Sequence, residues 1–135
     1  EIPGIPLMGD KVKIFDADHA KLYDFNIDIL DRGGVQCYVF SIKTKSGLSG
    51  FDKGKMVIDE MVTWFDYKSF EVLARNYSMS YNAGVYHFDV RMEVEMTHAG
   101  KYLVPSVIRY NGSWGVAFKK KERGIFTATI FDVAE

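Results

Sequence analysis

The sequence predicts a mainly all-β fold: an antiparallel up-and-down meander of about eight strands, curled into a half-barrel or an incomplete barrel. Apolar residues recur at every second position in several segments, which is the period of a half-buried strand. Short segments rich in Gly, Asn and Asp separate these runs, as expected for hairpin turns. No stretch shows the period of an amphipathic helix longer than two turns.

Length and charge limit the class of protein further. A chain of 135 residues and 15.4 kDa has room for one domain with one core. We expect residues 1–10, with Pro3 and Pro6, to form an extended arm or linker, and residues 11–135 to form a single β domain. With 17 Lys+Arg against 18 Asp+Glu, the chain lacks the basic excess of a general nucleic-acid binder. No signal-peptide pattern follows Glu1, so we expect a mature product or a piece of a longer protein.

The clearest strand starts at Tyr86. Over residues 86–96 six apolar residues alternate with His87, Asp89, Arg91, Glu93 and Glu95. A strand over 85–96 would span roughly 40 Å, which is too long to lie flat under the normal twist of a sheet. We therefore expect the sheet to curl, with its apolar side concave.

The other elements follow in chain order. Residues 23–29 alternate, the Gly33-Gly34 turn follows, and 37–42 is apolar on both faces, which together predict a hairpin. A short turn is expected at 18–22, a glycine-rich loop at 46–55 and a strand at 55–58. Residues 62–65 and 72–81 predict a second hairpin. The strand over 102–110 contains Pro105, which only an edge or a bulge tolerates. Asn111-Gly112 predicts a turn into 114–118, and a last turn at 119–124 precedes a strand over 125–133.

Several of these segments resemble known envelope proteins. Tyr23-Asp24-Phe25 with its hairpin into 36–40, and the stretch from Trp64 to Leu73, are similar to patterns of Bacteroidetes envelope proteins. Together with Val104-Pro105 and the segment 110–114, they resemble the outer-membrane lipoprotein carrier (LolA/LolB-like) superfamily over residues 20–133. That resemblance implies a periplasmic or outer-membrane-associated location and a concave apolar surface that receives acyl chains or another hydrophobic guest. The chain departs from the carriers because it lacks the helices that plug their half-barrel.

Polar residues give two interpretations of one strand face. His87 and Asp89 project from the same side, and with Glu93 or Glu95 they have the chemistry of a divalent-ion site or an acid–base pair. Ion pairs across neighbouring strands, with Glu71 and Arg75 among the partners, explain the same residues. His19 and His98 have no ligand-like spacing. We favour paired charges, and we predict no catalytic residue, metal site or cofactor.

Three further features have simple structural explanations. Cys37 lies in an apolar strand with nothing adjacent to lower its pKa, so inert packing is expected. Gly47, Gly50 and Gly54 precede a strand rather than a helix, which disfavours a phosphate-binding loop. The basic cluster over 119–123 is expected to be a solvated hairpin tip, and contact with anionic headgroups is its alternative role.

Aromatic residues make up 15% of the chain and provide the candidate site. Aromatic side chains and methionines together make an adaptable apolar surface, although they also fill ordinary β cores. The residues expected to line the concave face are Tyr77, Met79, Tyr86, Phe88, Met92, Tyr102, Ile108 and Trp114. We expect a non-enzymatic envelope protein that binds a hydrophobic small molecule, a lipid or a lipidated partner there. The alternatives are an assembly domain whose apolar face is buried in a homodimer or against another domain, and a small enzyme that uses His87 and Asp89.

Overall fold

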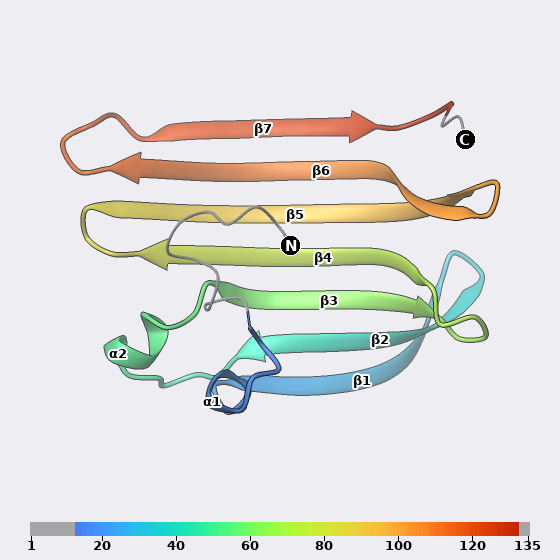
Figure 1. Cartoon of the computed structure of the whole chain (residues 1–135), viewed down its shortest axis with the longest axis horizontal. Helices are drawn as coiled ribbons and strands as arrows, with labels where there is room; N and C mark the ends of the chain where they lie inside the picture. The colour runs from blue at the N-terminus through green and yellow to red at the C-terminus, as the bar shows by residue number, and fades with distance from the viewer. Residues whose placement is uncertain (1–12, 133–135) are drawn as a thin grey trace.

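The computed structural model describes residues 13–132. Within them, seven antiparallel strands form one sheet in the order β1-β2-β3-β4-β5-β6-β7, so each strand pairs with its sequence neighbours (Figure 1). The strands are β1 (Tyr23–Arg32), β2 (Val35–Thr44), β3 (Ile58–Asp66), β4 (Val72–Asn82), β5 (Tyr86–Ala99), β6 (Tyr102–Val116) and β7 (Glu122–Thr129). In the described part of the chain β1 and β7 do not pair, so the barrel stays incomplete. The predicted all-β meander is confirmed; the arm expected at residues 1–10 lies outside the described residues.

Two single-turn helices accompany the sheet. The first, α1 (Ala17–Ala20), lies close to the short turn predicted at 18–22, and α2 (Gly50–Lys53) lies inside the predicted glycine-rich loop. Ser49 caps α2, because its Oγ accepts a hydrogen bond of 3.1 Å from the Asp52 backbone N–H. Neither helix is long and apolar enough to cross a bilayer, and no other helix occurs within residues 13–132.

The turn predicted at Asn111-Gly112 is wrong. β6 runs without interruption through both residues, which explains why seven strands form where about eight were expected. Gly112 does not have the positive φ of a hairpin turn. Instead, the Tyr110 ring lies across its backbone, where a Cβ atom would collide with the ring. The glycine therefore serves close packing within a strand rather than a turn.

Pro105 lies at a bulge, as its missing N–H requires. In the β5–β6 register Glu95 pairs with Val107 and Met96 pairs with Pro105, so Ser106 is the extra residue of β6. β7 pairs with β6 only from Val107 onward. Among the described strands, none on that side of β6 would accept a hydrogen bond from residue 105, so proline is tolerated there. The bulge also exchanges the faces of the β6 residues before it, because side chains alternate along a strand.

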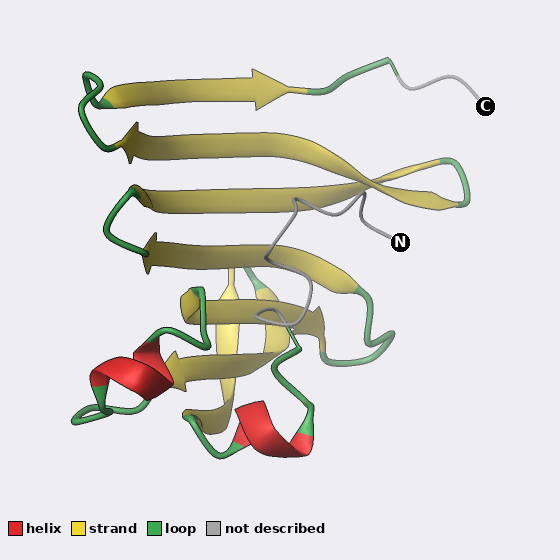
Figure 2. Cartoon of the chain, turned by 60° about the vertical axis from the view of Figure 1, so that its left-hand side comes forward, coloured by secondary structure: helices red, strands yellow, loops and turns green. Residues whose placement is uncertain are grey.

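The sheet curls most strongly in its N-terminal part. Arg32 at the end of β1 contacts Glu95 of β5, with Nη2 and Oε1 3.4 Å apart. Four strand spacings separate these strands in a flat sheet, a distance of about 19 Å that the two side chains cannot bridge. The first strands accordingly turn away from the direction of β4–β7 (Figure 2). Both side chains of this contact lie on the inside of the curl. The concave side of the sheet is therefore charged at this corner, and not apolar as expected.

Each face of the sheet has its own buried region. We call the side that carries Phe88 the apolar face and the side that carries Asp89 the charged face. On the apolar face a core forms at the end of the sheet near α2, and the segment before β1 and the loop before β3 cover it. Its buried members are Ile14, Leu22, Tyr23, Ile42, Met56, Val57, Ile58 and Phe88. On the charged face, under the curl, Cys37, Val39 and Ala74 are buried.

Candidate binding surface

The strand register gathers most of the predicted site residues on the apolar face. Cross-strand partners share a face, and Phe88 pairs with Tyr81 on one side and with Trp114 on the other. Met92 likewise pairs with Tyr77 and Tyr110. The predicted residues that share the apolar face are Tyr77, Met79, Tyr86, Phe88, Met92, Ile108 and Trp114.

Tyr102 is the exception among the predicted residues. It pairs with Ala99 near the end of the β5–β6 hairpin. The extra residue at Ser106 moves Tyr102 to the charged face, opposite to Ile108. Its ring is exposed, with the Lys101 ammonium 5.1 Å from the ring centroid. Period-two counting from Ile108 places Tyr102 on the wrong face because sequence alternation alone does not reveal a bulge.

The apolar face divides into a covered and an open region. Phe88 is only 8% exposed and belongs to the core, and Met79 and Trp114 pack against that core. Trp114 is also fixed by its indole N–H, which donates to the Glu122 carboxylate over 2.8 Å. These three residues therefore act mainly in packing. Tyr77, Met92 and Ile108 lie outside that cluster and are half-buried, so they belong to the open region.

Three residues of the open region were missing from the predicted set, namely Val94, Tyr110 and Phe126. Tyr110 and Phe126 face each other across β6 and β7, and their rings stack with centroids 5.0 Å apart. Tyr110 was obscured because Asn111-Gly112 predicted a turn directly after it. Phe126 follows the basic cluster in a short strand that has only one neighbour. We define the open apolar surface as the half-buried or exposed group Tyr77, Met92, Val94, Ile108, Tyr110 and Phe126.

Two of the tyrosine hydroxyls on the apolar face, those of Tyr77 and Tyr23, have a pKa that is raised mainly by burial. Burial raises the pKa of Tyr77, against the opposing effect of the nearby Arg75 charge. Burial, reinforced by the negative charge of Asp59, raises the pKa of Tyr23 to about 12. Within the described residues the buried Tyr23 hydroxyl has no hydrogen-bond partner. Both phenols therefore stay neutral at physiological pH.

The charged face shows ion pairs across its strands. Arg109 of β6 lies 3.6 Å from Glu93 and 3.6 Å from Glu95 of β5. His98, which alternates with Ala99 and so lies on the other side of β5, contacts the Glu71 carboxylate at 3.2 Å. Arg75 lies on the apolar face, where its Nε donates to the buried Thr63 hydroxyl over 3.0 Å. Glu71, Glu93 and Glu95 are therefore paired with basic side chains, as expected. Arg75 was expected to pair with a carboxylate, but its partner is the Thr63 hydroxyl.

His87 and Asp89 both line the hollow of about 660 Å³ that borders α2 and the β4–β5 turn. The His87 ring packs against Gly115, where a Cβ atom would meet it. Asp89 faces a hollow of about 510 Å³ that also contains Arg91, Lys121 and Arg123. Among residues 13–132, no three His, Cys, Asp or Glu side chains group in a way that would hold a metal ion.

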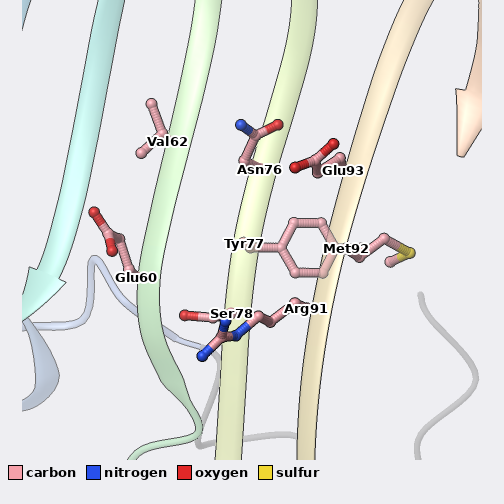
Figure 3. A pocket seen from close by; sticks show the side chains of 8 residues that line it. All are labelled: Glu60, Val62, Asn76, Tyr77, Ser78, Arg91, Met92 and Glu93. Atoms are coloured by element: carbon pink, nitrogen blue, oxygen red, sulfur yellow. The ribbon is translucent and has the colours of Figure 1, made fainter. Parts of the chain in front are cut away.

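Three hollows of the described surface lie mostly outside the open apolar surface. One of about 660 Å³ borders α2 and the β4–β5 turn. Another, of about 480 Å³, crosses β3, β4 and β5 on the charged face (Figure 3). Its lining residues are Glu60, Val62, Asn76, Tyr77, Ser78, Arg91, Met92 and Glu93. The third is the basic hollow beside Asp89. Apart from Tyr77 and Met92, which also border the hollow of about 480 Å³, no residue of the open apolar surface lines these three hollows. The surface is thus broad, whereas small-molecule sites normally enclose most of their ligand.

Comparison of the chain with protein-family models, with curated proteins and with solved structures found no match.

Proposed function

We propose that this protein is a non-enzymatic binding domain whose open apolar surface receives acyl chains, either of a lipid or of a lipidated partner protein. The observation that carries the proposal is the row Tyr77–Met92–Tyr110–Phe126, which crosses four neighbouring strands. It stays half-buried or exposed beside a separate, covered core. Large apolar patches left open on a protein surface are typical of interaction sites.

The chemistry of this surface suits an acyl chain. Methionine and aromatic side chains adapt to guests without a fixed shape, and the Tyr77 hydroxyl, whose pKa is raised by burial, remains uncharged. A broad surface suits an extended chain or a lipid layer better than a compact small molecule. The location we propose, the bacterial periplasm or the inner side of the outer membrane, rests on the carrier resemblance of the sequence.

Vesicles with brominated acyl chains test the proposal. The two tryptophans lie on opposite faces: Trp114 beside the open apolar surface and Trp64 on the charged face, with the Arg32 guanidinium 4.9 Å from its ring. We expect bromine to quench Trp114 in Trp64→Phe, and to leave Trp64 unquenched in Trp114→Phe. An absence of vesicle binding, or equal quenching of both, would overturn the proposal.

Two neighbouring residues of β5 provide matched variants. Met92→Gln removes an apolar contact from the open surface, and Glu93→Gln makes a change of similar size on the charged face. We expect Met92→Gln to weaken vesicle binding by about tenfold, because it removes part of the free energy gained by burying one large apolar side chain. Glu93→Gln should bind as the wild type does.

A second candidate function is assembly through the apolar face. Phe25, Ile27 and Ile29 of β1 are exposed on the same face as Phe126 of β7, so apolar area is open at both ends of the sheet. A homodimer, or a neighbouring domain, would cover such an area. In that case light scattering would report a dimer that Met92→Gln converts to a monomer, and bromine would quench neither tryptophan.

A further inference from the structure

The two edge strands of the sheet differ in how they are protected from pairing. In the described part of the chain β1 pairs only with β2, and β7 pairs only with β6, so each strand has one row of unpaired N–H and C=O groups. β1 carries exposed Asp24 and Asp28, charges that discourage a further strand. Residues 124–131, which begin after Glu122 and Arg123 of β7 and extend two residues past its end, contain no charge and no proline. This edge is therefore the unprotected one.

The side chains of the β7 edge favour β pairing. The segment 124–131 is rich in aromatic and β-branched residues, which fit pleated surfaces. Ile125 is 65% exposed, and Phe126, Ile130 and Phe131 are also exposed. Uncharged segments of this composition at a free edge are the ones that recruit another strand.

The hydrogen-bond pattern shows which groups are free. The Ile130 N–H donates to the Ser106 carbonyl over 2.8 Å. Along an antiparallel pair the backbone groups point alternately toward the partner strand and away from it. The N–H and C=O groups of Ile125, Thr127 and Thr129 therefore face away from β6 and are free to meet another strand.

We propose that β7 pairs antiparallel with β7 of a second copy of this chain about a two-fold axis, which joins the two sheets into one. A symmetric pair of β1 edges would bring Asp24 and Asp28 of one copy beside those of the other, and like charges across a ladder repel. Pairing β7 with β1 of a second copy would place these carboxylates against the uncharged β7 strip. Such head-to-tail contacts also form open chains of molecules, whereas two-fold pairing closes on itself.

The axis sets the geometry of the dimer. Antiparallel pairing of identical edges requires a two-fold axis perpendicular to the sheet, so both apolar faces lie on the same side. Phe126 of each copy then stands next to the junction, and the two open apolar surfaces become continuous. The pairing depends on the backbone edge and not on what binds the apolar face, so it is independent of the proposed function.

Two isoleucines of equal exposure provide the test. Ile125 in β7 and Ile27 in β1 are each 65% exposed, so a lysine at either position remains in solvent. We expect the wild type and Ile27→Lys to form a dimer in sedimentation equilibrium at micromolar concentrations. Ile125→Lys should weaken the dimer about tenfold or more, because it places like charges near the axis. Thr127→Lys is a second variant at the same edge, and circular dichroism verifies that each variant folds.

Amide hydrogen exchange locates the contact. In the dimer the outward N–H groups of Thr127 and Thr129 should be protected, and in Ile125→Lys they should exchange rapidly. A wild type that stays monomeric at high micromolar concentration overturns the proposal. A dimer that survives Ile125→Lys and Thr127→Lys but dissociates in Met92→Gln also overturns it, because the apolar face is then the interface. Species larger than two that Ile27→Lys abolishes would overturn it in favour of head-to-tail pairing.

Discussion

Gly112→Ala tests the close packing that replaces the predicted turn. A Cβ atom at Gly112 would lie 2.6 Å from Cζ and 2.8 Å from Cε1 of Tyr110, about 1 Å inside normal carbon–carbon contact. The Tyr110 ring has little room to shift because it stacks on Phe126. We therefore expect the ring to rotate away from the sheet.

The magnitude follows from what the ring loses. The stack with Phe126 contributes about 0.5–1.5 kcal/mol, and re-exposing about 60 Å² of ring costs about 1.5 kcal/mol at about 25 cal/mol per Å². Replacing glycine by alanine within a strand returns about 0.5–1 kcal/mol. The free energy of unfolding should fall by about 1.5 kcal/mol, which corresponds to a decrease in Tm of about 3–6 °C.

Urea unfolding followed by circular dichroism measures this change, with Gly124→Ala as the matched control. Gly124 pairs directly with Gly112, but its Cβ would meet Trp114 at an ordinary 3.4 Å, so Gly124→Ala should be neutral or slightly stabilising. In a Tyr110→Ala background the cost of Gly112→Ala should disappear. If Gly112→Ala is as stable as the wild type, or its cost persists without the Tyr110 ring, the proposed close packing is refuted.

Two further predictions concern a thiol and a turn. Cys37 is fully buried, and burial raises the pKa of its thiol. A thiol reagent should therefore label Cys37 only as fast as the protein unfolds. Labelling that is as fast in native buffer as in urea would contradict this prediction. The backbone N–H groups of Lys68 and Ser69 donate to the Asp66 carboxylate at 2.7 and 2.8 Å and lower its pKa below the ordinary 3.8. Because the folded-state pKa is the lower one, this contribution to stability is complete at neutral pH and declines as the pH falls below about 4. Urea unfolding should therefore show Asp66→Ala less stable than the wild type at pH 7, with the difference shrinking in acid; a difference that grows in acid would contradict the assignment.

The sequence alone determined the all-β class and the positions of most strands. Alternation over 86–96 and the paired glycines at 33 and 34 are local signals, since a side-chain period of two and a positive φ depend only on nearby residues. For the same reason the β1–β2 hairpin and the long β5 strand formed as predicted. Seven of the eight predicted surface residues share one face because antiparallel neighbours align their side chains.

Tertiary structure decided what each of these residues does. Phe88 and Tyr77 have the same strand pattern, yet only Phe88 is covered by the core, because the chain before β1 and the loop before β3 fold over one end of the sheet. Tyr102 changed face because a bulge at Ser106 depends on how two strands pair rather than on either strand alone. Gly112 serves packing rather than a turn because the Tyr110 ring occupies its surface. Contacts between distant residues determine burial, face and curvature, and no local period encodes them.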